Sequence, residues 1–414
     1  MKSLSASLWI VVLLGSCLAK NETTHVLKSG NWRATIEIQG QLLPFNLEVF
    51  KTTSDNYAIN IRNADEKILL DEVTVTGDSV DIVLHIFDAD IKARIEGDTL
   101  KGEFIKNYEK DYRIPFRAVY GQNYRFETAE HQEQIPDFSG KYAVQFVHEN
   151  DTTPAVAIFR QNGDRATGTF LTPTGDYRYL EGNVSGGHLQ LSAFDGNHAY
   201  LFRASKEPNG TLIGEYFSGK TWEESWYAKK DENASLPDEE KQTFLKEGYD
   251  RIEFSFPDVN GKKVSLTDDK YKDKVVILQL SGTWCPNCMD ETNFLAPWYI
   301  QNKSRGIEIL GLAYERKDDF AYASARVKKM VDKMNIPYDF VIAPATNDKA
   351  KASETLPMLN RIMAFPTTIF IGKDGKVKKI RAGFSGPGTG IYYDQFIQHF
   401  NETVNELLKE DKGL

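Results

Sequence analysis

The sequence predicts a fold in two parts, a tandemly duplicated antiparallel all-β region followed by a C-terminal α/β domain. From residue 25 to residue 228, short runs of alternating apolar and polar residues are separated by Gly, Asp and Asn, which is typical of strands. Short motifs recur inside this region at a nearly constant distance, which indicates a repeat. After about residue 248, strand patterns alternate with helical patterns, which is typical of an α/β sheet.

Composition places the chain among ordinary globular proteins. Its 414 residues correspond to two to four domains at roughly 100–200 residues each. Hydrophobic residues make up 41% and charged residues 26%, with a net charge of −9. Lys and Arg form no block along the chain, so nucleic acid, which is bound by neutralising phosphates, is not an expected partner.

The N-terminus reads as a signal peptide over residues 1–19. Lys2 precedes a short apolar run, Leu8–Leu14, which falls well short of the roughly 20 residues that span a bilayer. The sequence allows two alternative cleavage sites. Leu14–Cys17 resembles a bacterial lipobox, in which Cys17 would be acylated and would attach the chain to a membrane, whereas Cys17–Ala19 offers the small residues for ordinary cleavage before Lys20.

The β region is predicted to contain two copies of one meander, over residues 25–121 and 137–228. The matched motifs are separated by 107 to 112 residues in the same order along the chain. They are Gly30-Asn31-Trp32 with Gly140-Lys141-Tyr142, Val75–Val80 with Val184–Leu189, Phe87-Asp88 with Phe194-Asp195, and Thr99–Phe104 with Thr211–Tyr216.

Each copy is expected to have about seven or eight strands and to be closed or nearly closed, because closure leaves few exposed edges. Aromatic residues are dense in both copies, among them Trp32, Tyr142, Phe194, Trp222 and Trp226. Core packing is the default interpretation of these side chains, and a calyx for an apolar ligand is the alternative.

A polar linker over residues 229–247 leads to the α/β domain at residues 248–414. The expected elements are a buried strand at Val275–Leu280, a helix from Cys285 to Asn302, a strand at Ile307–Leu312, a helix at Tyr322–Met334, strands at Pro366–Ile371 and Val377–Ala382, and a final helix at Tyr393–Lys409.

Cys285 and Cys288 carry the strongest chemical signal. They follow the buried strand directly and begin the next helix, where unpaired amides and the helix dipole favour a thiolate. Two intervening residues leave the second sulfur one turn further on, near enough to resolve a mixed disulfide. The pair therefore predicts thiol–disulfide chemistry at a CXXC motif.

Two structural interpretations of the pair are weaker. Zinc in a structural site needs four ligands, and beyond residue 200 the sequence adds only His399 to the two cysteines. A structural disulfide that closes so short a loop would stabilise the fold little. We therefore predict no metal site.

Three stretches resemble the thioredoxin superfamily, and specifically the exported TlpA/ResA-like thiol–disulfide oxidoreductases of bacteria. They are Val275–Cys288, the following Met289-Asp290-Glu291, and Phe365-Pro366-Thr367-Thr368. The resemblance covers about residues 250–410, and residues 20–247 resemble no family. It implies a thioredoxin-like fold and no cofactor other than the Cys285–Cys288 disulfide. Peroxidase chemistry is disfavoured, because Gly282 stands where peroxiredoxins need Thr.

The resemblance also implies roles for single residues. Cys285 would attack a substrate disulfide and Cys288 would resolve the mixed disulfide. Pro366 would be the cis-proline that packs against the CXXC motif, and Phe365 and Trp284 would contact substrate. Pro286 and Asn287 would tune the redox potential.

Glu291 lies one helical turn after Cys288. It matches a carboxylate that follows the second cysteine by three residues in ResA-like reductases, and such a group could shuttle the proton released when thiols become a disulfide. A solvated first-turn acid is the alternative for Glu291, and it is the expectation for Asp290.

The sequence thus predicts an exported oxidoreductase of the periplasm or cell envelope. Its expected partners are a disulfide-containing protein substrate and an upstream thiol protein that donates electrons. Reduction is favoured over oxidation or isomerisation, although Asn287 stands where reducing members commonly carry Pro. The alternative function is a ligand- or partner-binding β-barrel protein with an appended redox-sensing domain.

Overall fold

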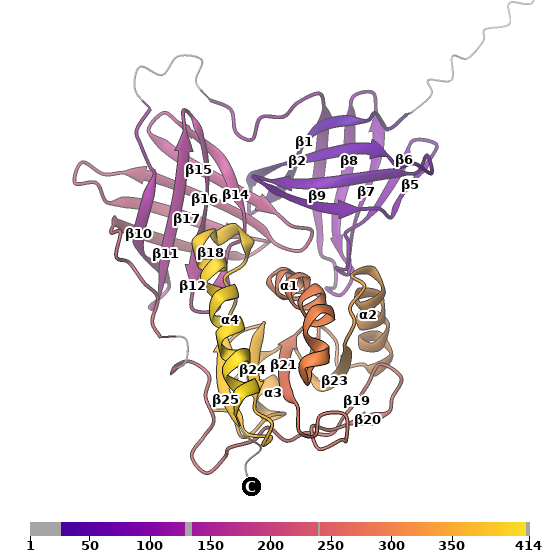
Figure 1. The fold of residues 1–414 in the computed structure, drawn as a ribbon. Coiled ribbons are helices and arrows are strands. Elements are labelled where there is room, and N and C mark those ends of the chain that lie inside the picture. Colours follow the sequence, from indigo (N-terminus) through magenta and orange to yellow (C-terminus); the bar gives the residue numbers. More distant parts are fainter. Residues whose placement is uncertain (1–25, 129–134, 239–240, 411–414) are drawn as a thin grey trace, which may run out of the picture.

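The computed structural model describes residues 26–128, 135–238 and 241–410. Two barrel-like sheets lie side by side and an α/β domain packs beneath both of them (Figure 1). The predicted signal peptide, with Cys17, lies outside the described residues. In the part of the chain that is described, no helix is long and apolar enough to cross a membrane.

The first copy forms an antiparallel sheet that we call barrel 1. Its strands pair in the order β4-β3-β2-β1-β9-β8-β7-β6-β5. Their bounds are β1 Gly30–Ile38, β2 Gln41–Lys51, β3 Tyr57–Asn63, β4 Glu66–Leu70, β5 Val73–Thr76, β6 Ser79–Val83, β7 Ala89–Glu96, β8 Thr99–Lys106 and β9 Arg113–Tyr120.

The second copy forms barrel 2, with the order β11-β10-β18-β17-β16-β15-β14-β12-β13 and a further β11–β12 pairing that closes the ring. Its strands are β10 Gly140–His148, β11 Asp151–Asn162, β12 Arg165–Thr172, β13 Gly175–Asp176, β14 Leu180–Ser185, β15 His188–Phe194, β16 Ala199–Lys206, β17 Leu212–Ser218 and β18 Trp222–Lys230. The all-β prediction for this region is therefore confirmed, and the copies form two barrel-like sheets.

The matched motifs occupy equivalent places in the two barrels. Trp32 is the third residue of β1, and its indole Nε1 donates to the Lys28 carbonyl at 2.9 Å. Tyr142 is the third residue of β10, and its hydroxyl donates to the Phe138 carbonyl at 3.0 Å. Each side chain thus ties its first strand to the residue four positions earlier, and both are buried in their cores.

Aromatic side chains pack the interior of barrel 2. Phe170 stacks on Phe202 with ring centroids 4.6 Å apart, and Phe202 stacks on Tyr216 at 4.4 Å. Phe146 and Trp226 complete this cluster and are also buried. This packing agrees with the core interpretation of the aromatic residues.

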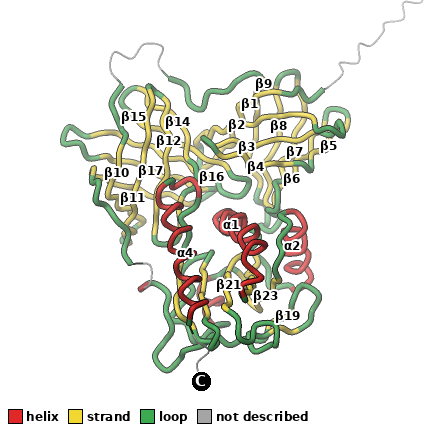
Figure 2. The backbone as a smooth tube through the Cα atoms, in the orientation of Figure 1, coloured by secondary structure: helices red, strands yellow, loops and turns green. Residues whose placement is uncertain are grey.

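The α/β domain is built on a sheet with the order β23-β22-β21-β24-β25, shown with its helices in Figure 2. β21, β22 and β23 run parallel, and β24 and β25 run antiparallel to β21 and β24 respectively. The elements are β19 Phe256–Pro257, β20 Lys263–Val264, β21 Val275–Ser281, α1 Pro286–Asn302, β22 Ile307–Glu315, α2 Phe320–Lys333, β23 Asp339–Thr346, α3 Lys349–Glu354, β24 Thr367–Ile371, β25 Val377–Ala382 and α4 Ile391–Lys409.

Corresponding loops of the two barrels contact the α/β domain. Loop A, residues 84–88 between β6 and β7, reaches α2, where the Tyr322 hydroxyl donates to Asp88 at 2.9 Å. Loop B, residues 195–198 between β15 and β16, reaches the start of α1, where Asn197 Nδ2 donates to the Trp284 carbonyl at 2.8 Å.

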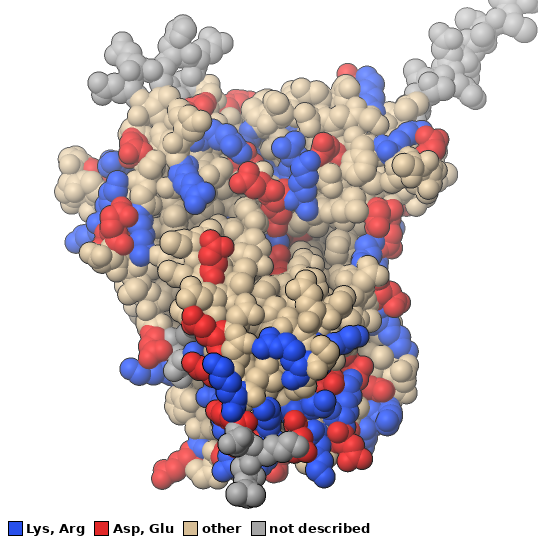
Figure 3. All heavy atoms as spheres, viewed as in Figure 1, with Lys and Arg blue, Asp and Glu red and all other residues tan. Residues whose placement is uncertain are grey.

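On the face shown in Figure 3, acidic and basic side chains are intermixed.

Candidate active site

Cys285 and Cys288 form a disulfide at the start of α1, with their Cα atoms 5.2 Å apart. Cys285 is the N-cap residue and Pro286 opens the helix, a position where the missing proline N–H costs nothing. The Cys288 amide donates to Cys285 Sγ at 3.2 Å. Both residues are nearly buried, with 4% of Cys285 and 2% of Cys288 exposed.

The loop before β24 lies against this disulfide. The Phe365–Pro366 peptide bond is cis, and the Phe365 carbonyl oxygen is 3.5 Å from Cys285 Sγ. The Trp284 ring meets the Phe365 ring edge-on, with centroids 5.8 Å apart. Trp284 is itself held by a 2.8 Å hydrogen bond from Nε1 to the Tyr314 carbonyl. The structure therefore brings Trp284, Phe365 and Pro366 together around Cys285.

Glu291 is buried beneath α1 and is not a solvated acid. Gln279 Nε2 donates to one carboxylate oxygen at 2.8 Å, and Thr368 Oγ1 donates to the other at 2.5 Å. Glu291 is 1% exposed. Burial raises the pKa of Glu291 above its ordinary value, although the hydrogen bonds from Thr368 and Gln279 act to lower it. A carboxylate whose pKa is raised binds a proton more readily than an exposed one, which suits it to accept a proton from a neighbouring group.

The expectation that Asp290 is solvated is wrong. Its side chain is 12% exposed and forms an ion pair with Arg178 of the β13–β14 connection. Burial raises the pKa of Asp290 above its ordinary value, and the Arg178 charge opposes this shift by favouring the ionised carboxylate. The physical reason is the position of barrel 2, which covers the side of α1 that would otherwise face water.

Arg178 is the central residue that the sequence reasoning missed. It is 2% exposed and pairs with Glu66 of barrel 1 and Asp290 of α1, and its Nε lies 3.7 Å from Asp195 of loop B. Both closest partners lie 112 positions away in sequence. A lone Arg among tyrosines carries no local signal for such partners, so only the tertiary structure reveals them.

Barrel 2 also contacts the backbone around the CXXC motif. Arg178 donates to the Pro286 carbonyl at 2.7 Å, and Asn287 Nδ2 donates to the Asp176 carbonyl at 3.0 Å. With the Asn197 bond to Trp284, these contacts span the residues before and between the cysteines. The intervening dipeptide, Pro286-Asn287, is therefore fixed by the β region.

A pocket of about 410 Å³ opens at Cys285. One wall comes from the α/β domain and includes Trp284 and Phe365, while barrel 2 supplies the other with Tyr177 and Tyr200. A second cavity, of about 320 Å³, lies between barrel 2 and α4.

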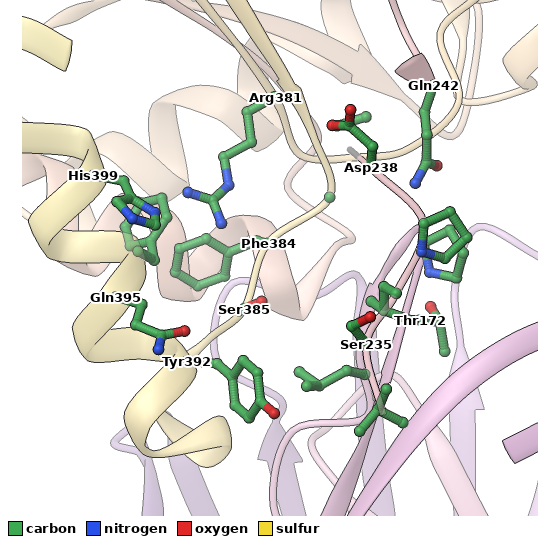
Figure 4. Close-up of a pocket in the computed structure, with 18 residues that line it drawn as sticks. Thr172, Ser235, Asp238, Gln242, Arg381, Phe384, Ser385, Tyr392, Gln395 and His399 are labelled. Atoms are coloured by element: carbon green, nitrogen blue, oxygen red, sulfur yellow. The ribbon is translucent and has the colours of Figure 1, made fainter. Parts of the chain in front are cut away.

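Figure 4 shows this second cavity, with Arg381, Gln395 and His399 on one side and Ser235 and Gln242 on the other. Its lining includes neither cysteine, so it is separate from the disulfide. Among the described residues, no group of three or more His, Cys, Asp and Glu side chains is arranged to hold a metal ion.

Known proteins resemble the α/β part of the chain. The model of the AhpC/TSA family matches residues 248–380. Thiol-disulfide oxidoreductase ResA of Bacillus thuringiensis strain Al Hakam is 31% identical over 140 residues, which cover 34% of this chain and 70% of that protein. ResA of Bacillus subtilis strain 168 is 29% identical over 139 residues, covering 34% and 69%.

Among solved structures, a thiol:disulfide interchange protein of the thioredoxin family from Chlorobium tepidum aligns with a TM-score of 0.29 and 23% identity, over 38% of this chain and 95% of that one. The ResA relatives and the family match rest on the domain that holds the CXXC pair. The chain therefore belongs to the thioredoxin superfamily, as a TlpA/ResA-like member of the thiol–disulfide oxidoreductases.

Proposed function

We propose that this protein is an exported thiol–disulfide oxidoreductase of the bacterial cell envelope that reduces disulfides in polypeptides. The observation that carries the proposal is the Cys285–Cys288 disulfide at the start of α1, which faces the cis-proline loop and opens into a pocket. Cys285 is the attacking cysteine and Cys288 the resolving one. No cofactor beyond this redox-active pair is proposed.

The chemistry begins with the reduced pair. The Cys285 thiolate attacks one sulfur of the substrate disulfide, a mixed disulfide forms, and the first substrate thiolate leaves. Cys288 then attacks Cys285 Sγ, which forms the intramolecular disulfide and releases the second substrate thiolate. Two electrons pass from the protein dithiol to the substrate, and the two thiol protons end on the substrate thiols.

The surroundings of the pair support this sequence of steps. The Cys288 amide, 3.2 Å from Cys285 Sγ, favours negative charge on that sulfur. Cys288 is 2% exposed, so its thiol is shielded from oxidants other than the mixed disulfide at Cys285. Glu291 accepts the Cys288 proton as that thiol becomes a nucleophile. Trp284, Phe365 and Pro366 contact the substrate, and Pro286 and Asn287 tune the redox potential.

The cellular setting is a proposal that rests on the sequence. Residues 1–19 direct export, and Cys17 is the proposed point of lipid attachment, so that the catalytic domain works in the envelope. An upstream thiol protein returns the oxidised pair to its reduced form. The predicted boundaries at 25–121, 137–228, 229–247 and 248–414 remain predictions.

A trapping experiment tests the activity. In Cys288→Ser the mixed disulfide cannot be resolved, so Cys285 should hold substrate in a covalent adduct that a reducing agent releases. Adducts are measured by non-reducing electrophoresis and mass spectrometry of envelope extracts, with Cys285→Ser as the control. Equal adduct formation by both variants, or none with an unreactive Cys285, contradicts the proposal.

The direction of electron flow follows from the reduction potential of the pair. A value near about −270 mV, as in thioredoxin, supports a reductant. A value near about −120 mV, as in strong oxidants, would make the protein a disulfide donor. Equilibration of residues 20–414 with glutathione or dithiothreitol buffers gives this potential.

A further inference from the structure

The mouth of barrel 2 lies directly over the attacking cysteine. The 410 Å³ pocket at Cys285 is lined on the barrel side by Tyr177, Tyr200 and Tyr216, with Trp222 at its edge. Cys285 is only 4% exposed, so a substrate sulfur must approach it through this pocket. The β region is therefore part of the surface that a substrate meets.

The barrel wall is aromatic and pre-formed. The Tyr177 ring packs edge-on against Tyr200 and Tyr216, with centroids 5.1 Å apart in both pairs. The His198 ring stacks on Tyr200 at 4.9 Å. Burial raises the pKa of the phenols of Tyr177, Tyr200 and Tyr216, so these three hydroxyl groups stay neutral at neutral pH. Such a wall suits an apolar or aromatic group flanked by hydrogen-bonding peptide groups.

The wall cannot drift away from the disulfide without breaking specific contacts. Asn197 bonds the Trp284 carbonyl at 2.8 Å, Asn287 bonds the Asp176 carbonyl at 3.0 Å, and Arg178 bonds the Pro286 carbonyl at 2.7 Å. These bonds hold both sides of the pocket in one geometry. A pocket of this size is in the range for drug-sized ligands and is too small to admit a folded domain.

We propose that barrel 2 selects the substrate of the redox site, and that the substrate is a disulfide on a short, flexible peptide segment with an aromatic residue next to the cysteine. This inference rests on the proposed function, because it assigns the substrate class of the same CXXC pair. The segment inserts its cysteine toward Cys285 and packs the neighbouring aromatic ring against the tyrosine wall. The electron balance is that of the reduction described above, with a dithiol donor restoring the pair.

Three disulfides test the selection on the reduced full-length chain. They are the disulfide dimer of N-acetyl-Phe-Cys-amide, the same dimer with Ser in place of Phe, and oxidised glutathione, with bis(2-hydroxyethyl) disulfide as the reference for the chemistry alone. Oxidation of the pair is followed by acid quench, alkylation and mass spectrometry. We expect the Phe dimer to react about tenfold faster than the other two disulfides, because the free energy of one aromatic contact corresponds to a preference of about that size.

The exposed aromatics of β18 provide a matched pair of variants. Trp222 is 45% exposed and lines the pocket, whereas Tyr227 is 47% exposed on the same strand and does not. Trp222→Ala should lower the preference for Phe over Ser about threefold or more, and Tyr227→Ala should leave it unchanged. Thr174→Trp, at the exposed edge of the pocket, should slow the Phe dimer more than tenfold relative to the reference disulfide.

The outcomes separate the two proposals. If the reference disulfide fails to oxidise the pair, the proposed function itself fails. If the reference reacts but the Phe dimer shows no preference, or Trp222→Ala and Thr174→Trp behave as Tyr227→Ala, the selection by barrel 2 is overturned while the function stands. Fastest reaction with oxidised glutathione overturns the substrate class.

Discussion

Adjacent residues of α1 face different neighbours, and this decides what each can do. Glu291 points to the sheet and bonds Gln279 and Thr368, whereas Asp290 points to barrel 2 and pairs with Arg178. One residue of helix corresponds to a rotation of about 100°, so such a split is expected of neighbours. The sequence supplied the spacing of Glu291 from Cys288, but it held no information on the barrel that covers Asp290.

Glu291→Gln tests the buried carboxyl. Because the pKa of Glu291 is raised in the fold, its contribution to stability is fully present below its ordinary value of 4.5 and is lost as the pH rises through the raised pKa. The Gln variant lacks this loss, so its stability relative to the native chain should increase between about pH 5 and about pH 8. Urea unfolding at both values measures the difference.

The same variant should slow oxidation of the reduced pair about 10²-fold or more, as expected when a proton acceptor is removed. Glu402→Gln, on the exposed face of α4, is the control and should change neither property. An unaltered rate in Glu291→Gln would show that Glu291 only fills space beneath the helix.

At the scale of elements, strands and helices with a strong local sequence pattern can be predicted, whereas those with a weak pattern cannot. The buried strand, the helix that follows it and the terminal helix correspond to β21, α1 and α4. The sequence pattern does not predict β23, because Pro344 interrupts it and a proline within an apolar run favours an edge strand or a loop. β23 lies at the edge of the sheet, where a missing donor is tolerated. The short helix α3 was also missed, since Lys349–Glu354 is too brief to show a period.

The repeat was the most informative pattern for the β region. Its constant offset predicted two similar meanders, and the strand orders of the two barrels agree once β3 is matched with β12. Closure differs between the copies, because β12 pairs with both β11 and β14. No local motif encodes that difference.

At the scale of the whole molecule, one side chain joins three parts. Arg178 of barrel 2 pairs with Glu66 of barrel 1 and with Asp290 of α1, next to Asp195 of loop B. Removing the cation would leave the carboxylates of Glu66 and Asp290 without their charged partner in a buried site, whereas Asp195 would keep His198. This guanidinium therefore contributes to the placement of both barrels over the redox site.

We expect Arg178→Met to destabilise the protein by about 3–5 kcal/mol, the cost of breaking a buried ion pair from one side. Urea unfolding of the full chain measures this free energy. Arg165→Met is the matched control, because Arg165 is 56% exposed and pairs with Glu181, and it should cost about 1 kcal/mol or less. Equal losses in the two variants would mean that Arg178 does not hold the junction.

Loops A and B occupy the same position in two copies of one unit, yet they have separate duties. The Asp88 carboxylate of loop A accepts from Tyr322 of α2, away from the cysteines, while the Asp195 carboxylate of loop B lies beside Arg178 and the redox helix. Loop A therefore joins barrel 1 to α2, and loop B joins barrel 2 to the residues around the CXXC motif. If barrel 2 selects the substrate as proposed, substitutions in loop B should alter the choice of substrate, whereas substitutions in loop A should alter only the attachment of barrel 1 to the α/β domain.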